Sequence, residues 1–274
     1  MTGTSWWQTP YEDLAVAVHE ASGRRVAVVR FDLPERRNAM SVPMTASWVA
    51  LMTALREDRE LAAVVVTGRG RAFNAGGDLS WILGDPDATA PQLRRRMLAF
   101  YRDWLTVRDL EVPTIAAVNG PAIGAGFAVA LACDIRYVAT TARMGVPFTS
   151  LGLHPGMATT WSLPEVAGIA VARDLLLTGR IVDGEEAVRL GLASRAVPVE
   201  RVLDEALSAA ERVAAAAPVA TALTVAALRD GGHATFEDAL RWEGLAQAVT
   251  LTTQDAREGI GAASERRPPT FTGR

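Results

Sequence analysis

The amino-acid sequence predicts an α/β fold followed by a helical C-terminal region. Strand, loop and helix patterns alternate along most of the chain, which favours a sheet with helices packed on it. Two short runs, residues 62–68 and 114–118, are almost wholly apolar, as is typical of parallel strands that are buried on both faces. From Val199 to about Ala263 the pattern is helical and rich in alanine, so we expect a boundary near Pro198.

The predicted core domain, residues 1–198, begins with a β-hairpin. Residues 14–20 and 25–31 have the composition of strands, and a Ser-Gly pair at 22–23 supplies the turn between them. A loop follows, and then a helix over residues 43–58. This helix has apolar residues at helical spacing and a proline at the first-turn position that proline favours.

The middle of the core is expected to repeat the unit of strand, glycine-containing loop and helix. A loop punctuated by glycines follows the first apolar run and leads into a short helix near residues 79–83. Residues 91–110 have the apolar stripe of an amphipathic helix. The second apolar run passes through three glycines into a helix, and short strands are expected at residues 134–139 and 142–147.

The rest of the chain is mainly helical. Helices are expected at residues 159–177 and 184–190, and a short strand at residues 194–198. The C-terminal region, residues 199–274, then contains helices only. No internal sequence repeat is visible.

Composition excludes several classes of function. A net charge of −3 provides no basic face for a nucleic-acid partner. No apolar run approaches the roughly 20 residues of a membrane span, and the first residues lack the basic and apolar segments of a secretory signal. We therefore expect a cytoplasmic protein with neither a membrane nor a nucleic acid as its partner.

The scarcity of reactive side chains restricts the chemistry further. Cys133 is the single cysteine, which excludes an internal disulfide and a cysteine-rich metal site. The three histidines are scattered without metal-binding spacing, so no metal site is expected. No lysine occurs, which excludes Schiff-base chemistry and a Walker lysine. Backbone groups, histidine, carboxylates or the substrate itself must carry the chemistry.

The stretch Asn119–Asp134 is the most informative part of the chain. A strand that turns through small residues into an apolar helix leaves the first N–H groups of that helix without partners. Such a helix start stabilises negative charge, either on a phosphate or on a developing oxyanion. The stretch alone does not identify the charge.

Two glycine-rich segments in order resemble the crotonase (enoyl-CoA hydratase/isomerase) family. One is GRGRAFNAGGDL at residues 68–79, and the other is NGPAIGAGFAVALACDIR at residues 119–136. The later run LLLTGRIVDGEEAVRLGL is similar to the family as well. The resemblance covers residues 14 to 260. It implies a crotonase-type spiral of β-β-α repeats with a helical C-terminal region, which covers the acyl pocket and contacts neighbouring subunits in a homotrimer or hexamer.

The resemblance also implies a substrate and a site. Members of the family act on acyl-CoA thioesters, so coenzyme A would enter as part of the substrate and no separate cofactor is expected. Two backbone N–H groups that hold the thioester oxygen would belong to Gly77 and Ala125. Preorganised donors of this kind stabilise an enolate-like oxygen, and losing one costs about 3 kcal/mol.

Contacts to coenzyme A are implied on both sides of the first glycine-rich segment. Arginine suits phosphate groups in a chain without lysine, and Arg37 sits where the family grips them. Asp78 also fits a helix cap, because a predicted short helix follows it at once. The residues that match the family's substrate and coenzyme A contacts are Arg37, Ala39, Asn74, Ala75, Gly76, Asp78, Leu79 and Phe148.

The catalytic carboxylates of the family are missing from this sequence. Hydratases of the family use two glutamates, and the matching positions here are Ala128 and Phe148. Neither side chain can act as an acid or base, so hydration is not the expected reaction. The sequence around residues 146–164 is closer to the isomerase branch, whose single carboxylate base matches Gly156.

His154 is the titratable residue that is nearest in sequence to this missing base. Histidine as a residue type suits proton transfer, although a structural histidine under the loop is an open alternative. We therefore expect an acyl-CoA enzyme with isomerase-like proton transfer. The alternatives are a non-catalytic acyl-CoA-binding protein that has lost its acid/base residues, and a scaffold with a vestigial site.

Overall fold

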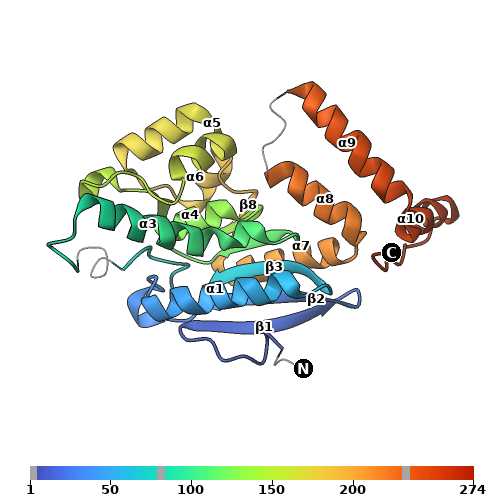
Figure 1. Cartoon of the computed structure of the whole chain (residues 1–274), viewed down its shortest axis with the longest axis horizontal. Helices are drawn as coiled ribbons and strands as arrows, with labels where there is room; N and C mark the ends of the chain where they lie inside the picture. The colour runs from blue at the N-terminus through green and yellow to red at the C-terminus, as the bar shows by residue number, and fades with distance from the viewer. Residues whose placement is uncertain (1–4, 79–83, 230–234) are drawn as a thin grey trace.

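The computed structural model describes residues 5–78, 84–229 and 235–274, and its sheet runs through the centre of the core (Figure 1). Its strands are β1 (Leu14–Ala21), β2 (Arg24–Phe31), β3 (Leu61–Gly68), β4 (Thr114–Val118), β5 (Ala122–Ile123), β6 (Ile135–Ala139), β7 (Met144–Gly145) and β8 (Arg195–Val197). Six of them form one sheet in the order β1-β2-β3-β4-β6-β8, and β5 pairs with β7 in a second, two-stranded sheet.

Helices account for most of the remaining described residues. They are α1 (Val42–Glu57), α3 (Ala90–Leu105), α4 (Ala125–Ala132), α5 (Thr159–Thr178), α6 (Gly184–Arg189), α7 (Val202–Ala214), α8 (Pro218–Arg229), α9 (Phe236–Leu251) and α10 (Gln254–Glu265). Short 3-10 helices are η1 (Pro34–Arg36), η2 (Thr106–Asp109), η3 (Thr149–Leu151) and η4 (Val199–Arg201). The short helix expected near residues 79–83 lies outside the described residues.

The predicted α/β alternation is confirmed strand by strand. β1 and β2 form an antiparallel hairpin, and Ser22 (φ 51°) and Gly23 (φ 72°) make its turn. Every later pairing of the six-stranded sheet is parallel, from β2–β3 to β6–β8. All residues of β3 and β4 are buried, as expected for parallel strands covered on both faces.

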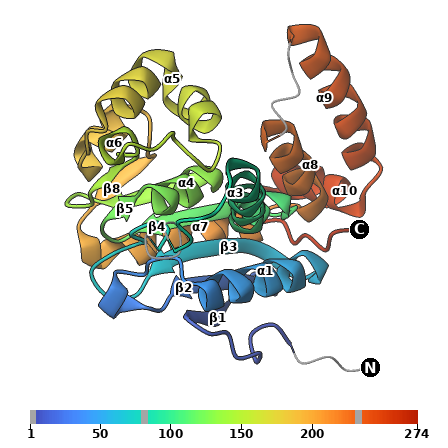
Figure 2. The ribbon, with the colours of Figure 1, turned by 60° about the vertical axis from the view of Figure 1, so that its left-hand side comes forward.

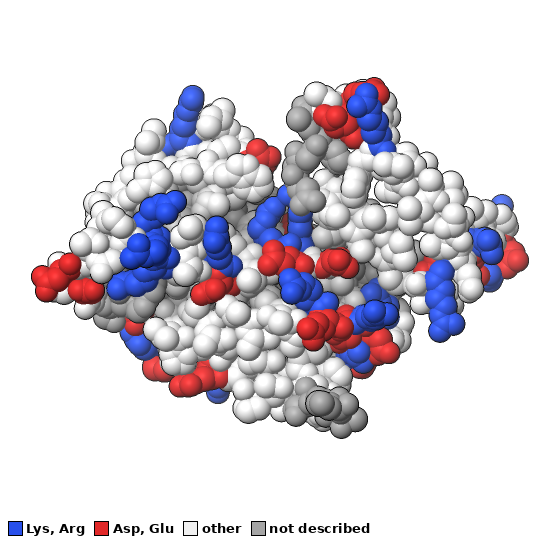
Figure 3. Space-filling model, viewed as in Figure 1, with Lys and Arg blue, Asp and Glu red and all other residues white. Residues whose placement is uncertain are grey.

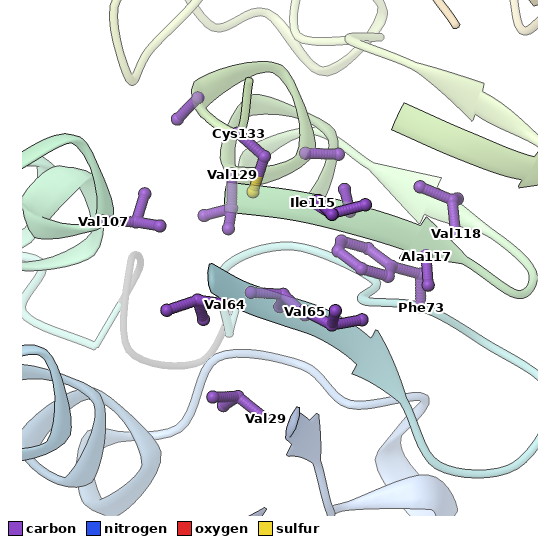
Figure 4. Packing of buried hydrophobic residues seen from close by; sticks show 14 of the residues in the cluster. Val29, Val64, Val65, Phe73, Val107, Ile115, Ala117, Val118, Val129 and Cys133 are labelled. Carbon is purple, nitrogen blue, oxygen red and sulfur yellow. The ribbon is translucent and has the colours of Figure 1, made fainter. Parts of the chain in front are cut away.

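The strands and α4 share one apolar core. Figure 4 shows Val64 and Val65 of β3 next to Ile115 of β4. Val129 of α4 and Cys133, the residue after this helix, lie on the other side of β4. All eight residues of α4 are buried. Burial raises the pKa of the Cys133 thiol to about 12, so this cysteine is an inert core residue.

The pair α1 and α3 is joined by a tryptophan contact. Trp48 stacks on Trp104 with ring centroids 5.2 Å apart, and both side chains are fully buried. The Trp48 indole N–H donates to the Trp104 carbonyl oxygen at 3.2 Å, and the Trp104 indole donates to Thr45 Oγ1 at 3.0 Å. Each large ring is therefore both buried and hydrogen-bonded.

Two predicted helices differ in detail from the observed ones. The helix expected at residues 91–110 ends as α3 at Leu105 and continues as the tighter η2. The C-terminal helical pattern is divided into several helices: α7 ends at Ala214, and α8 begins at Pro218, in the first-turn position that proline favours. Within α5, Gly168 has a positive φ of 78° and kinks the helix.

The helices after residue 198 divide into two groups. α7 packs against β2, β3, β4 and β6, and in Figure 1 it crosses behind the sheet. Helices α8, α9 and α10 form a separate arm beside the core (Figures 1 and 2). Within the described ranges no single helix is long and apolar enough to cross a bilayer. The helical segment 199–214 and α8, which are bent by 117° relative to each other, together have the length and apolar composition of a membrane span.

Charged side chains of both signs are interspersed on the face shown in Figure 3. Arginines lie among aspartates and glutamates over the front of the core and the arm (Figure 3). Ion pairs join arginines to carboxylates on the surface, such as Arg180 with Asp174 at 2.7 Å. This face therefore presents mixed charge rather than a field of one sign.

Candidate active site

Two loops leave the carboxyl ends of neighbouring parallel strands, β3 and β4. The N–H groups of Phe73 and Asn74 both donate to the carbonyl oxygen of Pro121, at 3.0 Å and 3.1 Å. The Ile123 N–H returns a bond to the Asn74 carbonyl oxygen at 3.0 Å, and Asn74 forms a parallel bridge with Ala122. The glycine-rich segments that the sequence singles out are therefore hydrogen-bonded side by side.

A third segment, residues 37–40, lies along the first loop. The Ala75 N–H donates to the Arg37 carbonyl oxygen at 3.0 Å, and the Met40 N–H donates to the Gly76 carbonyl oxygen at 2.9 Å. Met40 also forms a parallel bridge with Gly77. The structure thus brings together the predicted contact residues around position 37 and those of the first loop.

Asn38 holds this third segment in place, and the sequence analysis did not identify it. Its side chain is fully buried, and its amide N–H groups donate to the carbonyl oxygens of Arg69, Ala72 and Phe73 at 3.0, 2.8 and 3.2 Å. Its φ is +57°, a left-handed conformation that asparagine adopts more readily than most residues. The sequence signal that could have identified Asn38 is the Arg-Asn pair at residues 37–38, inside a loop.

Gly76 is one point at which the two loops approach each other closely. This glycine has φ +95°, and a Cβ added to it would lie 2.6 Å from the Ile123 carbonyl oxygen and 3.4 Å from the Ala125 nitrogen. Gly77 therefore follows a residue that touches the start of α4. Within the described ranges, the N–H groups of Gly77 and Ala125 donate to no protein acceptor. Two free backbone donors are thus presented at one place.

Asn74 fixes the geometry of this contact. Its Oδ1 accepts the Gly76 N–H at 2.8 Å, and its side chain is fully buried. A Cβ added to Gly126 would lie 2.2 Å from the Asn74 carbonyl oxygen, so the first turn of α4 rests directly on the first loop. Only glycine at position 126 permits so close a backbone approach.

The positions of the expected carboxylates are apolar in the structure as well. Ala128 lies in α4 with 2% of its surface exposed. The Phe148 ring lies against the backbone of Gly124, since a Cβ added there would be 3.6 Å from its Cζ. Asp78, at the end of the first loop, forms an ion pair with Arg36 at 2.7 Å rather than lying free.

His154 lies on an exposed part of the loop that follows η3. Its Nδ1 is 2.7 Å from the Pro155 carbonyl oxygen, which suits an N–H donor. The imidazole lines a cavity of about 470 Å³ next to α5. Gly77, Ala125 and Phe148 are absent from the lining of this cavity, so the structure does not bring His154 together with the two free donors there. Leu79 lies outside the described residues.

Asp134 and Arg136 serve the fold. The Asp134 carboxylate accepts from the Thr114 N–H at 2.6 Å, and the Arg136 side chain donates to the Leu192 carbonyl oxygen at 2.7 Å. Burial lowers the pKa of the Arg136 guanidinium. Among the described residues, no group of three or more His, Cys, Asp or Glu side chains is arranged to hold a metal ion.

The chain is similar to known proteins over almost its whole length. The sequence model of the enoyl-CoA hydratase/isomerase family matches residues 21–274. A Thermus thermophilus protein that carries an enoyl-CoA hydratase name is 40% identical over 246 residues, covering 90% of this chain and 97% of the relative. A crotonyl-CoA hydratase of Syntrophomonas wolfei is 30% identical over 262 residues, covering 95% of this chain and 98% of the relative.

Solved structures agree with these sequence matches. The crystal structure of an enoyl-CoA hydratase from Bacillus anthracis has a TM-score of 0.89 and 30% identity, and the match covers 96% of this chain and 100% of that one. This likeness confirms the predicted crotonase-type fold. With the family model matching over most of the sequence, the chain belongs to the enoyl-CoA hydratase/isomerase family.

Proposed function

We propose that this chain is an acyl-CoA enzyme that stabilises a thioester enolate with the N–H groups of Gly77 and Ala125. The proposal rests on one observation: Gly76 lies against the first residue of α4, and the N–H groups of Gly77 and Ala125 have no protein acceptor among the described residues. Preorganised donors stabilise the negative charge that develops on a thioester oxygen. The helix dipole of α4 adds to this stabilisation at its N-terminal end.

Isomerase-like proton transfer is proposed over hydration. Hydration requires a group that activates water within hydrogen-bond reach of the substrate. Ala128 and Phe148 supply no such group, and Ala128 is closed off in the core with 2% exposure. Moving a proton between substrate carbons needs only one acid/base group, and His154 is the candidate that the sequence offers.

The coenzyme A portion of the substrate is proposed to bind along the first loop and its neighbour segment. Arg37 is exposed, and its guanidinium suits the phosphates of coenzyme A. The hydrogen bonds between residues 37–40 and 75–76 support a shared surface. The residues proposed for this contact are Arg37, Ala39, Asn74, Ala75, Gly76 and Asp78, with Leu79 from the sequence alone and Phe148 toward the acyl group.

A non-catalytic acyl-CoA-binding protein is the second candidate function. The apolar residues at both hydratase positions favour it, because a binder needs the two donors but no acid or base. It predicts tight binding of acyl-CoA without any exchange of substrate protons.

The first prediction separates these functions with panels of 2-enoyl-CoA and 3-enoyl-CoA thioesters. We expect deuterium from D2O to enter the substrate carbons, with 3-enoyl-CoA converted to 2-enoyl-CoA and no hydration product. Absorbance of the conjugated thioester measures conversion, and proton NMR measures exchange. His154→Ala is run in parallel to test whether this imidazole moves the proton.

Three results would change the assignment. Hydration of 2-enoyl-CoA would contradict the isomerase-like proposal. Binding of acyl-CoA in calorimetry without conversion or exchange would favour the binding protein. Absence of binding would contradict both functions and leave the scaffold alternative.

We also propose that the protein forms a homotrimer or hexamer through its C-terminal arm. Large apolar side chains on α8, α9 and α10 are exposed in the single chain, among them Leu228 at 79%, Phe236 at 79% and Leu245 at 70%. Apolar side chains gathered in this way mark an interaction surface. Light scattering with size-exclusion chromatography is expected to give three or six times the mass of 29.2 kDa. A monomer would contradict the proposal.

A further inference from the structure

The Tyr101 hydroxyl occupies the space in which a side chain at position 156 would lie. A Cβ added to Gly156 would be 2.5 Å from the Tyr101 Oη and 2.9 Å from its Cζ. Gly156 is buried, so the ring of Tyr101 reaches from α3 into the loop between η3 and α5. Any larger residue at position 156 would displace the phenol.

The phenol is a free proton donor. Burial raises the pKa of Tyr101, and no hydrogen bond contributes to this change among the described residues. The hydroxyl is therefore protonated near neutral pH, and its proton is not committed to a protein acceptor. A half-buried, unpaired hydroxyl is unusual for a purely structural tyrosine, whose O–H normally finds a partner.

The phenol lies between α3 and the loop that precedes α5. α4 contacts both α3 and α5, and Figure 2 shows α3 beside α4. Phe148, the residue before η3, has its ring against Gly124, the residue before Ala125. Tyr101 on α3 and the loop before α5 therefore belong to or adjoin two helices that contact α4, the helix that begins with the Ala125 donor.

We propose that Tyr101 Oη is the catalytic group that transfers the substrate proton, an inference that rests on the proposed function. The Cα electron pair of the enolate forms a C–H bond with the phenol proton, and the phenol O–H bond breaks. Charge leaves the thioester oxygen as its carbonyl re-forms, and the resulting phenolate takes a proton from solvent. The enolate forms in the opposite direction: the phenol first releases its proton to solvent, and the phenolate removes the Cα proton, so that the Cα–H bond breaks, the phenol O–H bond forms and the charge moves to the thioester oxygen. Protonation of the dienolate at Cγ instead converts the 3-enoyl thioester to the 2-enoyl thioester.

The test compares the full-length wild-type protein with Tyr101→Phe. The substitution removes only the hydroxyl, for which the described residues provide no hydrogen-bond partner. Deuterium incorporation into 3-hexenoyl-CoA is expected to fall by about 10²-fold or more, the usual contribution of a general acid or base. Affinity for hexanoyl-CoA, measured by calorimetry, is expected to stay unchanged. Tyr11→Phe, which removes a hydroxyl far along the chain on the N-terminal segment, is the matched control and should exchange at the wild-type rate.

A second variant, Gly156→Ala, tests the geometry without removing the phenol. Its methyl group would meet the hydroxyl at 2.5 Å, so the ring must shift and exchange should fall while hexanoyl-CoA still binds. Deuterium exchange that persists in Tyr101→Phe would overturn the role of Tyr101 but not the proposed enzymatic function. Exchange that is lost in His154→Ala and kept in Tyr101→Phe would have the same meaning. A wild-type protein that binds acyl-CoA without exchange would overturn the proposed enzymatic function together with this inference.

Discussion

Gly76→Ala is expected to lower the rate of substrate proton exchange by about 10²- to 10³-fold, the usual effect of losing one donor to an oxyanion. The added methyl group would lie 2.6 Å from the Ile123 carbonyl oxygen, closer than real side chains come. It would also lie 3.4 Å from the Ala125 nitrogen, in front of one proposed donor. The loops must separate to relieve this contact, and the N–H groups of Gly77 and Ala125 then no longer point at one oxygen.

The matched control for this variant is Gly23→Ala. Gly23 has a similar left-handed φ of +72°, but no atom lies within 4 Å of a Cβ added there. It therefore carries the backbone strain of a positive φ without the contact. Deuterium exchange into 3-enoyl-CoA and circular dichroism are measured on both variants. Equal rates in Gly76→Ala and Gly23→Ala, with both proteins folded, would contradict the role of the loop contact.

The sequence predicted most of the fold because its signals are local. The apolar runs of β3 and β4 and the Ser-Gly turn before β2 each have a clear periodicity or turn signature. The strand expected at residues 142–147 contains β7, but β5 and its pairing with β7 had no such signal, because β5 has two residues and depends on a partner elsewhere in the chain. The sequence also did not indicate that α7 packs on the sheet while the later helices form the C-terminal arm, because this division depends on contacts between α7 and distant strands.

In the candidate site, too, local motifs were predicted and long-range contacts were not. Glycine motifs identified both loops, and the hydrogen bonds between Asn74 and Ile123 confirm that the loops lie together. The buried amide of Asn38, which binds three carbonyl oxygens, and the phenol of Tyr101 against Gly156 were not foreseen. Both contacts join residues more than thirty positions apart, and side-chain types alone do not reveal such pairs.

Arg229→Met is expected to reduce the free energy of unfolding by about 3–5 kcal/mol, the usual cost of removing one partner of a buried ion pair. Arg229 is the last residue of α8 and is 9% exposed. Its Nε donates to Asp134 Oδ1 at 2.7 Å, and its Nη2 donates to Oδ2 at 2.5 Å. The guanidinium also donates to the carbonyl oxygens of Arg108, Leu110 and Val112. Methionine fills a similar volume but removes the Arg229 donor from each of these acceptors, so that, among the described residues, Asp134 Oδ2 keeps only its bonds from Thr114.

Because these bonds join α8 to the residues around β4, the loss should appear as a lower urea midpoint for the whole core. Arg229→Lys keeps the charge but loses the planar fork, so its midpoint should fall between those of the wild type and Arg229→Met. Arg241→Met is the control, since Arg241 is 71% exposed and pairs with Glu237 at 3.3 Å on the surface of α9. An exposed pair of this kind contributes about 0–1 kcal/mol. Equal midpoints for the Arg229→Met and Arg241→Met variants would mean that the buried network does not hold the arm to the core.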